Sequence, residues 1–409
     1  MNDLKKPELL APAGNMEKLE IAFLYGADAV YLAGEKFGMR ARGVNFNEEE
    51  LARAVELAHV LKRKIYITVN TMPRNAELEY LTEYLVFLRT VKPDALIVSD
   101  LGVWRLAREH APDIPLHVST QASAVNWACA QEWGDRGAAR VVLARELSLA
   151  EITQIRRKAA VEIEIFVHGA MCIAYSGRCL LSSYLTGRDA NRGLCAQACR
   201  WRYGVCEEKR PGEFFPLFED QSGTYVFNSR DLCLLAFLPQ LIEAGVDSFK
   251  IEGRMKSIHY VATAVSVYRQ AIDCYFEAPG SFKIKESWRA ELAKISHRPY
   301  TEGFIAGNPY ERAQKYETSS CRKSHDFVGL VRGFSDGFLL IEQRNNLRRG
   351  ERVELLRPDG RLAAMEISEM FDQTGAAIDA AAHPGQLFRV PCALPFPVNS
   401  LLRREIHDR

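Results

Sequence analysis

The sequence lacks several features that would assign a protein to a membrane, to a secretory route or to a nucleic-acid partner. No apolar run reaches the length of about 18 residues that a membrane-spanning helix needs, so we expect no membrane partner. The first residues contain no long apolar segment of a secretory signal, and we therefore expect a cytoplasmic protein with reduced thiols. Net charge is almost absent too, because 53 basic residues face 52 acidic ones. Overall charge therefore neither favours nor excludes a nucleic-acid partner.

Short apolar segments alternate with longer helical patterns from the start of the chain to residue 255. Near-continuous apolar strands between helices indicate a parallel sheet covered on both faces. Eight such units without a G-x-G-x-x-G fingerprint favour an α/β fold of the closed (β/α)8 TIM-type barrel class over an open dinucleotide-binding sheet. The expected strands are Glu8–Ala11, Ala29–Ala33, Ile65–Asn70, Ala95–Ser99, Leu116–Thr120, Arg140–Leu143, Glu162–Val167 and Asp247–Glu252.

Three segments are expected along the chain. Residues 1–278 are predicted to form the barrel, with a Cys-rich insertion at 169–234 after the seventh strand. Residues 279–325 are polar and mixed, which indicates a connector. Residues 326–409 alternate in polarity and contain the turn signals SDG and PDG, which predict a small C-terminal all-β barrel domain. Long insertions after barrel strands lie at the face where active sites are built.

The insertion concentrates the cysteines of the chain. An isolated cysteine is usually a small buried hydrophobe, but a polar, Arg-rich loop offers little core for six of them. Zinc favours two C-x2-4-C pairs, and only Cys195–Cys199 has this spacing. The C-x3-C-x2-C motif of radical enzymes fails, because position 202 is arginine. An iron–sulfur cluster with spread-out ligands is therefore favoured over zinc. The six cysteines are Cys172, Cys179, Cys195, Cys199, Cys206 and Cys233.

Residues 164–182, EIFVHGAMCIAYSGRCLLS, resemble the signature of the collagenase-like peptidase family, peptidase family U-32, at every fixed position. The segments PELLAPAGNMEKLEIAFLYGADAVYLAG, STQASAVN and HRPYTEGF are also similar to this family. The resemblance covers essentially the whole chain and is strongest to a branch that hydroxylates tRNA. Related branches hydroxylate ribosomal RNA or ubiquinone precursors.

The resemblance implies a cofactor, a reaction and a partner. The reaction is oxygen-independent hydroxylation of the wobble uridine of tRNA to 5-hydroxyuridine, with prephenate, a small dicarboxylate, as the oxygen donor. The cofactor is a four-iron four-sulfur (4Fe-4S) cluster, and Cys199 is a reserve ligand for it. The implied cluster ligands are Cys172, Cys179, Cys195 and Cys233.

Polar residues at the ends of the expected strands are further candidates for the site. Arginine is included because guanidinium groups bind carboxylates bidentately. For any one residue, a helix cap or a structural hydrogen bond is an equally good interpretation. The candidates for catalysis are His168, Asp100 and Glu252. The candidates for substrate binding are Asn70, Gln121, Arg178, Arg192 and Arg254.

Local charge supports an RNA partner modestly. Residues 178–202 contain five arginines against one acidic residue, and an aromatic side chain beside them can stack on an unpaired base. A solvated charged surface is the alternative interpretation. The candidates for RNA binding are Arg200, Trp201, Arg202, Arg348 and Arg349.

Two other classes of function stay open at this point. One is a peptidase with a cysteine nucleophile beside His168, although the metalloprotease motif HExxH is absent and the remaining cysteines would be unexplained. The other is a non-catalytic scaffold in which a cluster only holds the insertion together. The sequence does not indicate the oligomeric state.

Overall fold

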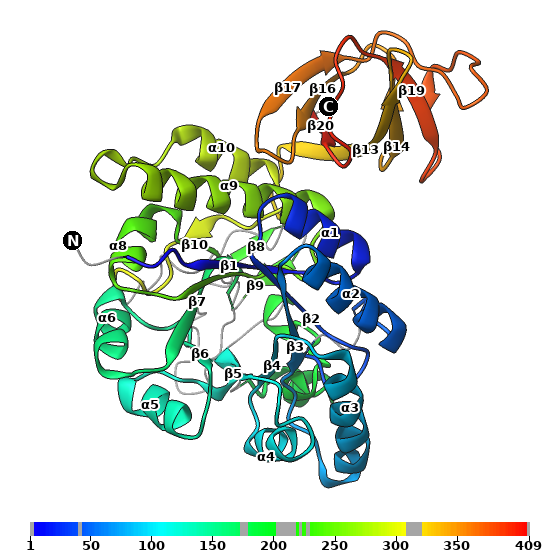
Figure 1. Ribbon diagram of the computed structural model, residues 1–409. Helices are drawn as coiled ribbons and strands as arrows, with labels where there is room; N and C mark the ends of the chain where they lie inside the picture. Colours follow the sequence, from blue (N-terminus) through cyan, green and yellow to red (C-terminus); the bar gives the residue numbers. More distant parts are fainter. Residues whose placement is uncertain are drawn as a thin grey trace.

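A closed barrel of eight parallel strands forms the centre of the structure (Figure 1). The computed structural model describes residues 4–39, 43–171, 179–201, 218–220, 223–225, 230–307 and 321–406. Neighbouring strands pair in chain order, and the last one pairs with both the first and the seventh, which confirms the predicted barrel. The barrel strands are β1 (Glu8–Pro12), β2 (Ala29–Leu32), β3 (Lys64–Val69), β4 (Ala95–Val98), β5 (Leu116–Val118), β6 (Arg140–Val142), β7 (Glu162–Ala170) and β11 (Ser248–Ile251).

Helices follow the strands and cover the outside of the barrel (Figure 1). Most of them begin at a side chain that accepts a backbone N–H of the first turn, and α2 has a complete capping box between Asn47 and Glu50. None of the helices in the described ranges is long and apolar enough to cross a membrane. The covering helices are α1 (Met16–Leu24), α2 (Glu48–Val60), α3 (Leu78–Val91), α4 (Leu101–His110), α5 (Trp127–Asp135), α6 (Leu149–Lys158), α8 (Leu238–Glu243) and α9 (Ile258–Glu277).

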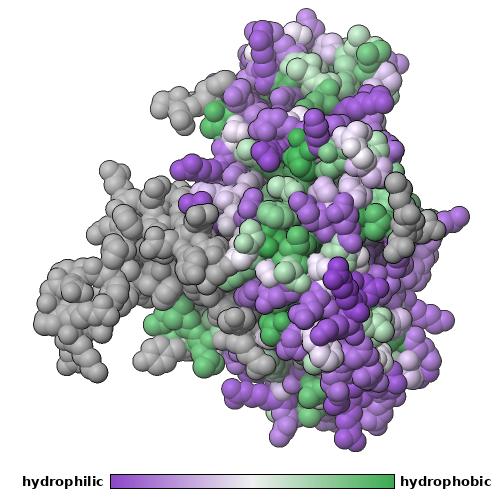
Figure 2. Space-filling view, turned by 90° about the vertical axis from the view of Figure 1, so that its left-hand side faces the viewer, coloured by the Kyte–Doolittle hydropathy of each residue, from purple (hydrophilic) through white to green (hydrophobic). Residues whose placement is uncertain are grey.

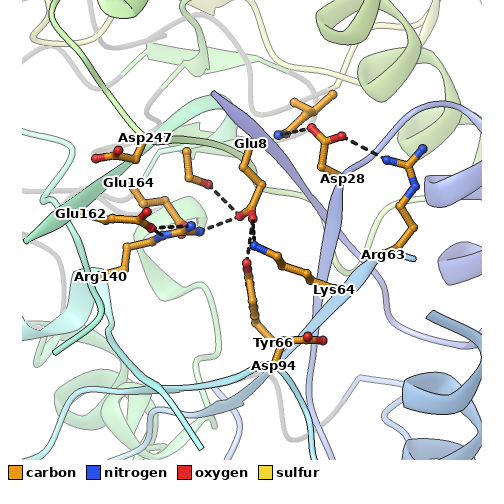
Figure 3. Close-up of polar contacts among 12 residues, drawn as sticks. Glu8, Asp28, Arg63, Lys64, Tyr66, Asp94, Arg140, Glu162, Glu164 and Asp247 are labelled. Atoms are coloured by element: carbon orange, nitrogen blue, oxygen red, sulfur yellow. Dashed lines mark hydrogen bonds and ion pairs between the residues drawn. The ribbon is translucent and has the colours of Figure 1, made fainter. Parts of the chain in front are cut away.

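Paired charges fill the barrel interior near the amino ends of the strands (Figure 3). Arg140 contacts Glu8 at 2.6 Å and Glu164 at 3.1 Å, and Lys250 donates to Glu164 at 2.9 Å. Burial acts to raise the pKa of Glu164, but the charges of Lys250 and Arg140 outweigh it and hold that pKa below its usual value. The interior is therefore a compensated ionic layer that joins β1, β6, β7 and β11.

The end of β7 contains an irregularity that decides where His168 lies. Phe166 is opposite Lys250, whereas His168 is opposite Ile251, so β7 has one extra residue at Val167. This bulge turns the His168 ring toward Tyr260 and Tyr268 of α9, outside the barrel wall. Beyond the barrel, β10 (Asp231–Cys233) pairs antiparallel with the end of β7, and β12 (Tyr300–Thr301) pairs with β10.

Short elements occupy the described parts of the predicted insertion and connector. The backbone N–H of Met72, after β3, donates to the carbonyl of Asn191, which fixes the insertion to the carboxyl ends of the barrel strands. These elements are α7 (Leu181–Thr186), η3 (Ala190–Arg192), η4 (Ala198–Arg200), β8 (Phe218–Asp220), β9 (Gly223–Tyr225), η5 (Leu235–Phe237), η6 (Pro279–Ser281) and α10 (Glu286–Lys294).

A small all-β domain follows, as predicted. Its main antiparallel sheet forms a half-barrel in the order β17-β16-β20-β13-β14-β19, beside a short β15–β18 pair (Figure 1). The SDG signal forms the β13–β14 turn, where Asp336 (φ 51°) and Gly337 (φ 79°) take the left-handed conformation of a type I′ hairpin. The strands are β13 (His325–Ser335), β14 (Phe338–Gln343), β15 (Leu347–Arg348), β16 (Arg352–Leu356), β17 (Leu362–Glu366), β18 (Ala380–Ala381), β19 (Leu387–Pro391) and β20 (Leu401–Glu405).

The all-β domain packs against the barrel helices through charged contacts. Glu17 of α1 pairs with Arg332 and Arg344, and the fully buried Arg403 contacts Glu291 of α10 at 2.6 Å and Glu354 of β16 at 3.0 Å. On the face shown in Figure 2, hydrophobic residues form small patches among hydrophilic ones. The interface between the domains thus combines these ion pairs with apolar contacts, because Leu330, Leu356 and Leu401 join the barrel core.

Candidate active site at the carboxyl ends of the barrel strands

Polar side chains from several barrel strands line a cavity of about 90 Å³ at the carboxyl ends, which we call the mouth cavity. Four of the candidates named from the sequence meet there, although they follow strands far apart in the chain. Its polar and charged lining residues are Thr68, Asn70, Ser119, Thr120, Gln121, Arg145, Lys250, Glu252 and Arg254. This is the face at which barrel enzymes bind their substrates.

Hydrogen bonds hold the lining side chains in place. Asn70 donates to the Ser119 hydroxyl at 3.3 Å, and the Tyr31 hydroxyl donates to the Glu252 carboxylate at 3.1 Å. The amide oxygens of Asn70 and Gln121 are buried and have no hydrogen-bond partner among the described residues. Buried polar atoms without a protein partner are typical of a surface that contacts a ligand.

The charges of the mouth cavity favour an anionic ligand. Lys250 is already compensated by Glu164, which leaves Arg145 and Arg254 facing the single carboxylate Glu252. Arg145 donates to the Ala170 carbonyl at 3.0 Å and lies over the Phe166 ring, which holds its guanidinium in one position. The cavity is small, so it suits a small group such as a carboxylate.

His168 lies outside the mouth cavity. Its ring is buried among Tyr260, Tyr268 and Tyr300, with centroid distances of 5.8, 5.6 and 5.3 Å. Burial lowers the pKa of His168 to about 3, so the imidazole is neutral at physiological pH. Both ring nitrogens lack a hydrogen-bond partner among the described residues. The placement therefore gives His168 no access to the mouth cavity, and its catalytic role stays a prediction.

Asp100 has a clear structural role at the start of α4. Its carboxylate accepts the backbone N–H of Val103 at 3.0 Å, which is the usual geometry of a helix N-cap. The side chain does not belong to the mouth cavity lining. Among the three candidates for catalysis, only Glu252 lies in the cavity.

The cysteines predicted to bind a cluster are described in part. Cys179, Cys195, Cys233 and the reserve Cys199 form no disulfide within the described residues and are partly buried, whereas Cys172 and Cys206 lie outside the described residues. Cys233 is opposite His168, its sulfur lies 3.8 Å from the Tyr268 hydroxyl, and burial raises the pKa of its thiol. Within the described ranges no three His, Cys, Asp or Glu side chains lie close enough to hold a metal. Cysteine thiols are the usual ligands of an iron–sulfur cluster. The predicted ligand set stays a prediction.

The candidate arginines are spread over three places. Arg178 and Arg202 lie outside the described residues, and the Arg200 side chain is not described. Arg192 pairs with Glu77 at 2.7 Å beside a second pocket, and Trp201 is exposed. Arg348 and Arg349 are exposed on the all-β domain. Of these residues, the ones whose side chains are described do not line the mouth cavity.

The described residues offer no support for a peptidase centre. Cys233 and His168 lie opposite each other, but burial raises the thiol pKa of Cys233 and lowers the imidazole pKa of His168, which opposes a thiolate–imidazolium pair. Residues 333–337 read G-x-S-x-G, the letters of a serine-hydrolase motif. They form the β13–β14 hairpin and not the strand–turn–helix elbow that such a nucleophile requires.

Sequence reasoning missed two charged residues of the mouth cavity, Arg145 and Lys250. The available signal for Lys250 was a lysine in the middle of an apolar strand, in the segment DSFKIE. A buried lysine needs a partner, and Glu164 on the neighbouring strand provides it. Arg145 follows β6 in an ordinary polar loop and carries no comparable signal.

Known proteins are similar to this chain over nearly its whole length. A family model described as peptidase family U32 matches residues 14–315, and one described as the peptidase family U32 C-terminal domain matches residues 323–403. The tRNA hydroxylation protein P1 of Bacillus subtilis is 43% identical over 94% of this chain and 92% of its own. The tRNA hydroxylation protein P of Escherichia coli is 39% identical over 97% and 96%. A 23S rRNA 5-hydroxycytidine synthase of Escherichia coli is 38% identical over 73% of this chain and 45% of its own.

Proposed function

Because the chain belongs to peptidase family U32, we propose that it is an RNA-modifying hydroxylase that acts on tRNA. The proposed reaction converts the wobble uridine to 5-hydroxyuridine without molecular oxygen. The observation that carries the proposal is the similarity to tRNA hydroxylation proteins, which extends over nearly all of both chains. The rRNA-modifying relative supports RNA as the general class of substrate.

The residues of the mouth cavity receive specific roles in this proposal. Arg145 and Arg254 bind a carboxylate of a small dicarboxylate oxygen donor such as prephenate, because both guanidinium groups line the cavity and such groups bind carboxylates bidentately. The amides of Asn70 and Gln121 hydrogen-bond polar groups of the bound molecules. Glu252 accepts the proton that leaves the base when a C–H bond is replaced by C–OH.

The proposal includes a 4Fe-4S cluster on Cys172, Cys179, Cys195 and Cys233. Replacing C–H by C–OH is a two-electron oxidation of the base, and the donor that gives up its oxygen would be reduced by the same two electrons. A bound cluster would supply one-electron transfer between them. Support comes from the free state of the three described thiols and from the contact between Met72 and Asn191, which places the insertion beside the barrel mouth.

Two measurements test the proposal. Protein purified without oxygen is expected to be coloured and to contain about four irons and four sulfides per chain. Mass spectrometry of tRNA and rRNA nucleosides is then compared between a deletion strain and the strain complemented with the wild-type gene. Loss of 5-hydroxyuridine derivatives that complementation restores is the expected result. An iron-free protein would contradict the cluster, and loss of a hydroxylated rRNA nucleoside alone would contradict the tRNA substrate.

A further inference from the structure

A second pocket, which we call the rim pocket, opens beside the mouth cavity and has a volume of about 450 Å³. It lies between the loops after β2 and β3, the start of α3 and the insertion. Its volume falls in the range of about 300–1,000 Å³ that is usual for small-molecule sites. The rim pocket is therefore large enough for a nucleobase with its ribose.

The walls of the rim pocket are mostly apolar and partly aromatic. Phe37, Met72, Pro73, Tyr80 and Leu194 supply this surface. Tyr80 projects from α3 with 58% of its surface exposed. Exposed aromatic rings are the groups on which unpaired bases of single-stranded RNA stack.

The polar groups of the rim pocket suit a phosphate or carbonyl oxygen. Lys36 is exposed at one edge. Arg192 pairs with Glu77 at 2.7 Å, so only Lys36 of these two cations has no ion pair within the described ranges. The Nε of Arg192 is buried and has no hydrogen-bond partner within the described ranges. A dicarboxylate would need two uncompensated cations, whereas an RNA strand needs one beside an apolar wall.

The two cavities are separated by a short stretch of backbone. Gly38 lines the rim pocket, and Met39 lines the mouth cavity. A Cβ atom at Gly38 would lie 3.6 Å from the Thr68 hydroxyl and 3.7 Å from Nη1 of Arg254, both of which line the mouth cavity. A molecule bound in the rim pocket is therefore directly beside the proposed site of chemistry.

We propose that the rim pocket binds an unpaired nucleobase of the substrate RNA, adjacent in the strand to the base that is modified. The neighbouring base stacks on Tyr80, and Lys36 contacts the RNA backbone. This inference rests on the proposed function and adds a recognition subsite to it. Among the described lining residues the one carboxylate, Glu77, is paired with Arg192, so we assign the rim pocket a role in recognition.

The test compares Tyr80→Ala with Val86→Ala, which changes another exposed residue of the same helix outside the pocket. Binding of the whole protein to a tRNA anticodon stem-loop RNA is measured, with the intact RNA and with RNAs that lack the base on either side of the modified uridine. Tyr80→Ala is expected to raise Kd about five- to hundredfold for intact RNA. One of the abasic RNAs is expected to bind wild type and Tyr80→Ala equally weakly. Val86→Ala is expected to match wild type.

A second variant separates stacking from charge. Lys36→Ala is expected to reduce the slope of log Kd against log salt concentration by about 0.7, the value for one phosphate contact in a single strand. The inference would be overturned if Tyr80→Ala bound RNA as tightly as wild type does. It would also be overturned if removing either neighbouring base weakened binding equally in wild type and Tyr80→Ala. Weaker prephenate binding by Tyr80→Ala with unchanged RNA affinity would assign the pocket to the small molecule and overturn it too. Failure of the proposed function would be seen separately, because the wild-type protein would then not hydroxylate the RNA, whatever its affinity for it.

Discussion

At the scale of single residues, Lys250 links the mouth cavity to the ionic layer beneath it. Its ammonium group donates to Glu164, which is completely buried. Removing one partner of a buried ion pair costs about 3–5 kcal/mol, because it leaves an uncompensated charge. We expect Lys250→Met to lower the free energy of unfolding in urea at pH 7 toward the lower end of that range, since Arg140 still contacts Glu164.

The pH dependence of this effect has a definite sign. The folded-state pKa of Glu164 is lowered, so its ion pairs stabilise the protein above the pKa of the unfolded carboxyl. Their contribution is lost as the pH falls through the acidic range below about 4.3. The difference between wild type and Lys250→Met should therefore shrink there, and Glu164→Gln added to Lys250→Met should recover part of the loss at pH 7. A difference that grows on acidification would contradict this account.

At the scale of elements, Asp100 caps α4 with its carboxylate. Replacing an N-cap by alanine costs about 1 kcal/mol, whereas asparagine caps as well as aspartate. We expect Asp100→Ala to lower the midpoint of urea unfolding and Asp100→Asn to restore it. Hydroxylated nucleoside levels in the complemented deletion strain should be normal with Asp100→Asn. Loss of activity in that variant at normal stability would show that the carboxylate itself takes part in the reaction.

At the scale of the whole molecule, the interface between barrel and all-β domain contains a buried histidine. The His259 ring stacks on Phe327 of β13 with a centroid distance of 6.1 Å. Burial, and then the charge of Arg403, lowers the pKa of His259 to about 3. The unfolded histidine has a pKa of about 6.5, so the unfolded state binds more protons below this pH and the stability falls as the pH falls toward 3.

His259→Phe removes this proton linkage while keeping an aromatic ring. We take the difference in unfolding free energy between the variant and wild type at each pH. This difference is expected to favour the variant by about 2 kcal/mol more at pH 5 than at pH 7. Urea unfolding at the two pH values measures it. An unchanged slope in His259→Phe would mean that this ring does not titrate on unfolding.

The sequence predicted the fold well because the signals for it are local. Eight apolar segments separated by helical patterns correspond to the eight barrel strands, since each pattern reflects burial on both faces of a parallel sheet. The SDG turn formed the expected hairpin, because the left-handed backbone at Asp336 and Gly337 depends on those residues themselves. Cys172, Arg178 and Arg202 lie outside the described residues, so their predicted roles stay predictions.

The sequence by itself determined that polar groups follow the barrel strands, and Asn70, Gln121, Glu252 and Arg254 do meet in one cavity. Parallel strands bring their carboxyl ends to one face wherever they stand in the chain. Only the tertiary structure decided that His168 faces α9, because a one-residue bulge depends on the register between β7 and β11. It also decided that Lys250 has Glu164 as its partner and that Tyr80 borders a pocket. Register and the position of loops in space depend on contacts between distant segments, which a local pattern does not record.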